Sequence, residues 1–321
     1  MNARHSTLAL AFSCSTLALA ATAFGAVNRS YTASHFALDL DGVPVGFLRS
    51  VEGGGISAPV ITVPGPNGGI PTKHIGQPVY EEFAVQVGPS NGKPVFDWIA
   101  ATLDMNFMRK SGALAAADFN LNTRSVRAFH DALLTEITFP AGDGAAKDPA
   151  FITLKFAPEY TRFKKASGKV KAESARTQEQ IIPANFRLDI PGLDCSGIVK
   201  IESLTVRASQ AITAVGESRD YQKEPGKIEY PNLKITLSEE TAQSWFQWHE
   251  DFVINGNNEH EKHKSGSLTY LNRNRQKELL TLNFQNLGIF RIVPAEKKDN
   301  EDKIATVTVE LYCESMTLKL N

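Results

Sequence analysis

The side chains best suited to chemistry gather in one short stretch, NNEHEKHK, which runs from Asn257 to Lys264. His260 and His263 lie three residues apart there, two glutamates lie beside them, and His249 lies upstream. Imidazole nitrogens and carboxylate oxygens are zinc ligands, so these three histidines are candidate metal ligands. The alternating charges are typical of a solvated loop, and the spacing lacks a third ligand fixed on a rigid element. We therefore expect no metal and no cofactor, and keep a metal-dependent hydrolase as a third hypothesis.

No other motif points to catalysis. GPNGGIP (Gly65 to Pro71) is rich in glycine, but no Lys-Ser/Thr follows it, so it is not a phosphate-binding loop. HExxH and CxxC patterns are absent from the sequence. Trp98, Trp245 and Trp248 could stack on a sugar, but they lie on apolar helical stripes, which is typical of core residues. We predict that the protein is not an enzyme.

Length and composition limit the classes of function that need testing. The chain has 321 residues, which is enough for two domains of ordinary size. Its 42% hydrophobic and 21% charged residues are typical of a globular protein rather than a disordered one. The formal net charge is −1, so no general attraction to nucleic acid or anionic membranes is expected. Nucleic acid is therefore not a partner that the sequence predicts.

Residues 1–26 differ in kind from the rest. An uncharged run extends from Ser6 to Val27, and Ala21-Thr22-Ala23 has the form of a signal-peptidase site. We expect a signal peptide or, alternatively, an N-terminal anchor, because the run reaches the length of a membrane span. Cleavage would place the protein in the periplasm or outside the cell; the alternative is cytoplasmic assembly or a virion-like particle. An exported protein could pair Cys195 with Cys313, and two free buried thiols are the alternative.

The chain repeats itself at an offset of about half its length. FALDLDG (Phe36 to Gly42) reappears as FRLDIPG (Phe186 to Gly192), and 186 − 36 gives an offset of 150. The offset has drifted to 155 where ITLKF (Ile152 to Phe156) meets VTVEL (Val307 to Leu311). Matches that keep one order along the chain indicate two copies of one fold.

Within each copy most apolar residues alternate, as in FAVQV (Phe83 to Val87) and LKITL (Leu233 to Leu237). Period-two burial predicts strands with one face on a core. PVFDWIAATL (Pro94 to Leu103) instead places apolar residues at helical spacing, and the segment from Thr241 to Ile254 does the same. The predicted fold class is mainly β with one helix per module. The expected divisions are a leader at 1–26, a first domain at 34–160, a basic linker at 161–184 and a second domain at 185–321.

Two stretches of low order occupy the same place in the two copies. One runs from Gly53 to Pro71 and includes Gly65; the other runs from Ser203 to about Pro225. A long loop inside a compact domain is usually functional or mobile. We expect both to be loops with a role in assembly.

The order of segments along the first copy resembles that of a known protein family. The opening FALDLDGVPVGFLRSVEGG (Phe36 to Gly54), a loop rich in glycine and proline, an alternating strand and then the Phe-Asp-Trp helix follow one another. That order resembles the contractile phage tail-tube proteins, whose fold also occurs in type VI secretion tubes and extracellular injection particles. The resemblance implies two tandem β-sandwich or barrel modules, each with a helix on its flank. In the family six modules close into a ring and rings stack into a tube, so three copies of a doubled chain would close one ring.

The resemblance therefore predicts a non-enzymatic structural protein that self-assembles into rings or tubes. Its main partner would be itself, with other tail-like or injection-particle components as further partners. Contact between rings is expected at the two assembly loops. The alternative is an exported monomeric β-sandwich protein that binds a carbohydrate or acts as an adaptor, which an exposed aromatic face on the second module would favour.

Overall fold

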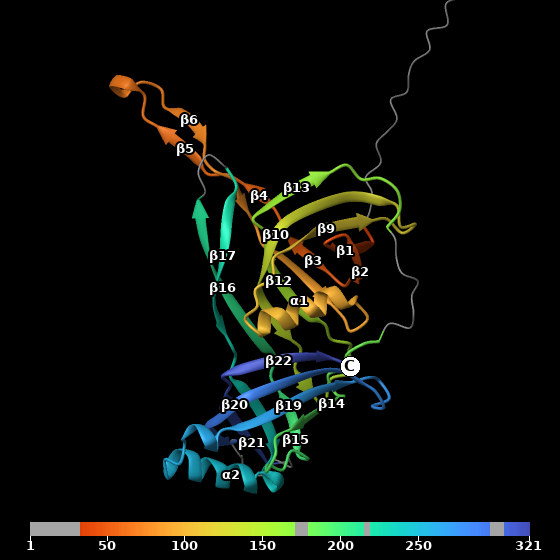
Figure 1. The fold of residues 1–321 in the computed structure, drawn as a ribbon, viewed down its shortest axis with the longest axis vertical. Helices are drawn as coiled ribbons and strands as arrows, with labels where there is room; N and C mark the ends of the chain where they lie inside the picture. The colour runs from red at the N-terminus through yellow and green to blue at the C-terminus, as the bar shows by residue number, and fades with distance from the viewer. Residues whose placement is uncertain (1–32, 171–178, 215–218, 296–304) are drawn as a thin grey trace, which may run out of the picture. The chain divides into compact units, whose positions relative to one another are not determined.

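The computed structural model describes residues 33–170, 179–214, 219–295 and 305–321 (Figure 1). The expected leader and Cys14 lie outside these residues. In the part of the chain that the structure describes, no helix is both long enough and apolar enough to cross a membrane.

The first sheet is built mainly from the N-terminal half. Its strands follow the order β2-β1-β9-β10-β12-β8-β3, and β13 also pairs with β10. The sheet curls toward closure, because the Arg49 N–H donates to the Gln86 carbonyl and the Gln86 N–H donates to the Ser50 carbonyl, which joins β8 to the turn between β2 and β3. The bounds are β1 (His35–Leu40), β2 (Val43–Leu48), β3 (Val51–Gly53), β8 (Phe83–Val87), β9 (Lys110–Ala117), β10 (Thr123–Phe139), β12 (Ile152–Ala157) and β13 (Tyr160–Lys164).

The second sheet repeats the same pairings. Its order is β11-β15-β18-β21-β20-β19-β14, and β22 also pairs with β20. Each of six pairings in the second sheet has a counterpart in the first. The counterparts of β14–β19, β19–β20 and β20–β21 are β1–β9, β9–β10 and β10–β12. The counterparts of β20–β22, β18–β21 and β15–β18 are β10–β13, β8–β12 and β3–β8. The bounds are β11 (Gly142–Asp143), β14 (Phe186–Asp189), β15 (Ile198–Ile201), β18 (Leu233–Ser238), β19 (Lys264–Leu271), β20 (Glu278–Pro294), β21 (Thr306–Tyr312) and β22 (Ser315–Leu320).

The alternating segments form strands because alternate side chains of a strand point to opposite faces. Phe83, Val85 and Val87 of β8 are fully buried, as are the matching residues of β18. In the first sheet Phe83 stacks on Phe156 with their ring centroids 5.2 Å apart. Period-two burial therefore gives each sheet an apolar inner face, as the sequence predicts.

One helix accompanies each sheet, so the prediction of a mainly β fold with one helix per module is confirmed. Helix α1 (Lys93–Leu103) packs against β2, β10 and β22. Helix α2 (Gln243–His249) continues as the π-helical segment η3 (Glu250–Ile254) and packs against β20. The three tryptophans are core residues: Trp98, Trp245 and Trp248 are all buried. The indole N–H of Trp245 donates to the Asp194 carbonyl at 2.9 Å.

Both stretches that we expected to be loops form β-hairpins instead. Between Gly53 and Tyr80 the structure has β4 (Ile56–Ser57), β5 (Val60–Val63), the short η1 (Pro66–Gly68), β6 (Thr72–Ile75) and β7 (Val79–Tyr80). The second stretch forms β16 (Leu204–Ala214) and β17 (Tyr221–Glu229). The glycines that suggested a loop lie at the ends of these strands, and the β-branched residues between them have high strand propensity. We call these segments the first hairpin (Gly53–Tyr80) and the second hairpin (Leu204–Glu229).

The segment expected as a linker, 161–184, is partly ordered into the fold. It begins inside β13, and Ile181 is fully buried and forms a β-bridge with Ala150. Cys195 and Cys313 are free thiols, of which Cys313 is the more buried. Burial raises the pKa of Cys313 to about 11, which keeps this thiol protonated at neutral pH.

Trp245→Ala is expected to lower the free energy of unfolding by about 3–5 kcal/mol, because it removes a fully buried side chain and leaves a cavity. Urea unfolding followed by circular dichroism measures the loss. Phe119→Ala is the matched control: Phe119 is 84% exposed, and its removal should change stability by less than about 0.5 kcal/mol. Equal losses in the two variants would contradict the core role of Trp245.

Candidate assembly interface

The second hairpin joins the two sheets strand to strand. Its first strand, β16, follows β15 of the second sheet but pairs antiparallel with β10 of the first. Four residue pairs form this joint: Glu136 with Arg207, Ile137 with Val206, Thr138 with Thr205, and Phe139 with Leu204. Figure 1 shows β16 and β17 running beside β10 and β12. We call the β10–β16 pairing the internal joint.

Apolar side chains fill one face of the internal joint. Ile137, Phe139, Leu204 and Val206 are each at most 1% exposed. Burying a side chain of this size stabilises a fold by about 1.5–3 kcal/mol relative to leaving it in water. On the other face the Thr138 and Thr205 hydroxyls lie 3.0 Å apart, within hydrogen-bond distance. The joint is therefore packed like the interior of a sheet rather than like a loose contact.

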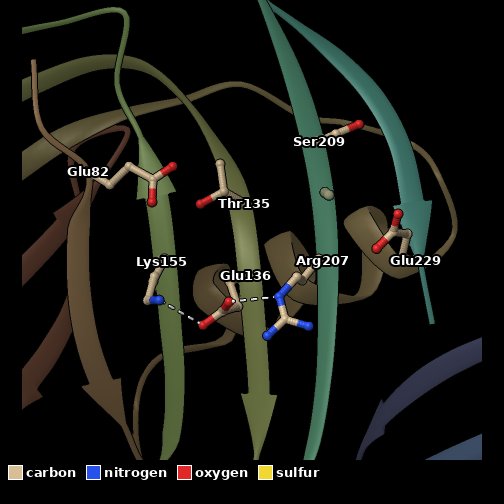
Figure 2. A pocket seen from close by; sticks show the side chains of 8 residues that line it. Glu82, Thr135, Glu136, Lys155, Arg207, Ser209 and Glu229 are labelled. Carbon is tan, nitrogen blue, oxygen red and sulfur yellow. Dashed lines mark ion pairs between the residues drawn. The ribbon is translucent and has the colours of Figure 1, made fainter. Parts of the chain in front are cut away.

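An ion-pair ladder crosses the same joint on its polar face. Glu136 on β10 contacts the Lys155 ammonium on β12 at 2.9 Å and the Arg207 guanidinium on β16 at 3.3 Å. Figure 2 shows the carboxylate between its two cationic partners, on three neighbouring strands. With 20% of its side chain exposed, Glu136 is better shielded from solvent than most surface ion pairs. The ladder favours the register in which Glu136 faces Arg207.

The depression around this ladder is not arranged for catalysis. Of its lining residues, Ser209 is the best placed nucleophile, but its hydroxyl accepts from the Lys227 N–H at 2.8 Å and lies 3.1 Å from the Lys227 carbonyl. The hydroxyl is thus held in the β16–β17 backbone pairing, and no histidine or cysteine lines the depression to activate it. The arrangement can fix strand register and can do little else.

Polar contacts hold the outer part of the second hairpin. Asp220 accepts from the Tyr80 hydroxyl and pairs with the Arg162 guanidinium at 2.7 Å. The Lys223 backbone N–H donates to the Glu159 carboxylate at 3.0 Å. Burial, together with the hydrogen bond to Asp220, raises the pKa of Tyr80, and burial lowers the pKa of the Lys223 ammonium. The second hairpin is therefore fixed along its length on the first sheet.

The first hairpin meets the second through the Tyr80–Asp220 hydrogen bond and through the Arg219 guanidinium, which donates to the Gly76 carbonyl, but no further strand pairs with it among the described residues. β4 pairs only with β7, and β5 pairs only with β6. Figure 1 shows β5 and β6 extending away from the other strands. Seven of its large apolar side chains are more than 40% exposed: Ile56, Val60, Ile61, Val63, Ile70, Ile75 and Val79. Exposed apolar side chains gathered on one hairpin in this way are typical of an interaction surface.

A second uncovered feature lies at the end of β20. From Gly288 to Pro294 this strand pairs with β21 on one side, while β19 and β22 pair only with its earlier residues. Among the described strands none pairs with the opposite edge of Arg291–Pro294. Phe290 and Val293 are 40% and 38% exposed there. Open strand edges readily accept a further strand.

The candidate histidines do not form a metal centre. His260 and His263 lie close, with ring centroids 5.6 Å apart, but the His263 Nε2 is 2.6 Å from the Tyr312 hydroxyl. Within the described ranges no three His, Cys, Asp or Glu side chains are grouped so that they could hold a metal ion. His249 ends α2, whereas His260 begins the separate turn η4 (His260–Lys262).

The expected assembly residues fall in the two hairpins. Gly53 ends β3, Gly65 flanks η1 and Pro71 precedes β6, whereas Ser203 precedes β16 and Pro225 lies in β17 opposite Gln210. The structure thus places the first three in the first hairpin, Pro225 in the second hairpin and Ser203 directly before it. Sequence reasoning missed the Glu136 ladder and the β20 edge. The signal that could have found them is an exchange of charge at the offset of 155, where Glu136 and Lys155 correspond to Arg291 and Glu310.

No protein-family model matches the chain, and no curated protein matches it. Similar solved structures exist. The cap that terminates the tube of the anti-feeding prophage is 16% identical, with a TM-score of 0.40; the match covers 47% of this chain and 99% of that one. A chain of the PVC sheath-tube complex, an extracellular contractile injection system, is 15% identical, with a TM-score of 0.34, and the match covers 43% and 89%.

Hcp1 from Flavobacterium johnsoniae is 16% identical with a TM-score of 0.27, and the match covers 43% of this chain and 96% of that one. The solved structures to which this chain is similar are tube and cap components of contractile injection systems and an Hcp protein, the class of protein that the sequence resembles. At these identities and TM-scores the likeness carries no conclusion about function.

Glu136→Gln is expected to destabilise the chain by about 1 kcal/mol, because Lys155 and Arg207 then face each other without the carboxylate between them. The loss should shrink in concentrated salt, which screens charges. Urea unfolding at low and high salt measures both effects. Glu278→Gln is the control, since its pair with Arg187 is more exposed and should contribute less than about 0.5 kcal/mol. Equal, salt-insensitive losses would show that the ladder does not stabilise the joint.

Proposed function

We propose that this chain is a non-enzymatic structural subunit, built from two tandem tail-tube-like modules, that assembles with copies of itself into rings or tubes. The modules are residues 34–160 and 185–321, exchanging strands through the second hairpin and β11. The observation that carries the proposal is the internal joint. Two sheets with the same pairing order are already joined edge to edge inside one chain, and this is a contact that further copies can repeat.

The stoichiometry follows from the doubling. A ring of six quasi-equivalent modules needs three doubled chains, and every second joint around it is then a contact between chains. The uncovered first hairpin and the open β20 edge supply the surface that such contacts need. Other tail-like components are further partners of a finished tube. The expected leader adds the proposal that assembly takes place after export.

A monomeric binding or adaptor protein is the second candidate function. The observation in its favour is the exposed apolar first hairpin, which suits a partner of another kind as well as a second copy. Its original support, an aromatic face for a sugar, is removed because Trp245 and Trp248 are buried. The self-assembling subunit therefore accounts for more of the structure.

Purified full-length chain is expected to form rings with threefold or pseudo-sixfold symmetry as its concentration rises. Negative-stain electron microscopy shows their symmetry, and sedimentation velocity measures their mass. Trimers of the chain and closed rings support the proposal. A monomer at every concentration would overturn it and leave the binding protein as the better hypothesis.

Deletion of Gly65–Gly69 is expected to abolish stacking of rings into tubes without unfolding the chain. The deleted residues surround η1 at the far end of the first hairpin and contribute no buried side chain to the core. Electron microscopy counts tubes against single rings, and the urea midpoint checks that the fold is intact. Unchanged tube length and unchanged stability would show that this turn has no role in stacking.

A further inference from the structure

The two hairpins occupy equivalent places in the two halves of the chain. In the first hairpin Ser57 pairs with Val79, and in the second Arg207 pairs with Glu229. Both partners are shifted by the same amount, since 207 − 57 and 229 − 79 are each 150. The register within the hairpin is thus the same in both halves, although only the second hairpin lies on a neighbouring sheet.

The receiving strands are equivalent in the same way. Glu136 on β10 is paired with Lys155 on β12, and Arg291 on β20 is paired with Glu310 on β21. The differences 291 − 136 and 310 − 155 are both 155. β10 receives the second hairpin on its other edge, whereas the same edge of β20 is open among the described strands.

The first hairpin and the open edge of β20 lie at opposite ends of one run of neighbouring strands. The run begins at β3, which continues into β4, and passes through β8, β12 and β10. It crosses the internal joint to β16, continues from β15 through β18 and β21, and ends at β20. A hairpin at one end and a matching open edge at the other fit head to tail, which requires a second copy of the chain.

We propose that two copies join through Gly54–Ser57 of one chain and Arg291–Pro294 of the next, in the register of the internal joint. The proposal rests on the self-assembly argued above and names the surface that performs it. Ser57 then faces Arg291, Ile56 faces Ile292, Gly55 faces Val293 and Gly54 faces Pro294. We call this pairing the outer joint.

Apolar surface is available on both sides of the outer joint. Ile56 is 41% and Val79 is 49% exposed on the hairpin, and Val293 is 38% exposed on β20. Ile292 is partly buried against the core, as Ile137 is fully buried in the internal joint. Covering these side chains removes apolar area from water on both chains.

Pro294 makes the outer joint weaker than the internal one. The neighbouring Ala295 N–H donates toward β21, so by strand alternation the Pro294 nitrogen faces the open edge. Proline has no N–H to donate, and the N–H of the opposing Gly54 is already bonded to the Glu82 carbonyl, so this end of the ladder lacks a donor on both strands. A proline on an edge also protects a free subunit from indiscriminate pairing.

Glu136 on β10 and Arg291 on β20 carry opposite charges, so the two strand edges favour different hairpins. At the internal joint Arg207 meets Glu136, and the pair is attractive. If the second hairpin of another copy approached the β20 edge, Arg207 would face Arg291, and like charges directly opposite each other destabilise a sheet. The first hairpin brings the neutral Ser57 to that position and avoids the repulsion. Charge thus directs copies into one alternating order.

Ser57→Arg is expected to weaken association of the full chain about fivefold per joint, because it recreates the Arg–Arg contact. Ser57→Glu is expected to preserve or strengthen association, because a carboxylate then faces Arg291. In an Arg291→Ser background the arginine at position 57 should have no effect. Sedimentation equilibrium on the four members of this cycle measures the coupling between the two positions. Thr62→Arg, on the exposed β5 of the same hairpin, is the control for added charge.

Crosslinking tests the same contact without relying on affinity. A chain with Ser57→Cys mixed with a chain with Arg291→Cys should form a disulfide between chains under mild oxidation, whereas Thr62→Cys with Arg291→Cys should not. Assembly of the wild-type chain with no coupling in the cycle and no crosslink would overturn the outer joint alone. A wild-type chain that stays monomeric would overturn the proposed function and the outer joint with it.

Discussion

The requirement that strand edges be paired governs this structure. A strand at the edge of a sheet presents backbone N–H and C=O groups that seek partners. The first sheet meets this requirement at β10 by taking β16 from the second half of the chain. Because that pairing is apolar on one face and held by Glu136 on the other, the two halves share a continuous run of strands. Among the strands that the structure describes, the edge of β20 at Arg291–Pro294 is the same requirement left unmet.

Equivalent segments of the two halves have different surroundings, and that difference is informative. The second hairpin is fixed by backbone pairing and by Asp220, Lys223 and Arg207, while the first carries a row of exposed apolar side chains. Both have the same internal register. The second hairpin pairs with a strand of the neighbouring sheet, and the first hairpin has the same internal register. The first hairpin is therefore expected to accept a strand of the same kind.

The tryptophans Trp98, Trp245 and Trp248 are core residues, as the sequence predicts, and the two described cysteines, Cys195 and Cys313, are free thiols. Ser209, in the depression beside the internal joint, is engaged in the β16–β17 backbone pairing. The two halves of the fold differ instead in which strand edges are open and in which charges lie beside them.

The sequence by itself determined the class of fold. The alternation in FAVQV and LKITL and the helical stripe around Trp98 are local patterns, and burial on one face follows from them directly. The repeat at an offset of 150 also lies in the sequence alone. Only the tertiary structure decided that the two glycine-bounded segments are hairpins and that one of them lies on β10. That choice depends on contacts between residues about 70 positions apart, such as Glu136 and Arg207, which no local periodicity encodes.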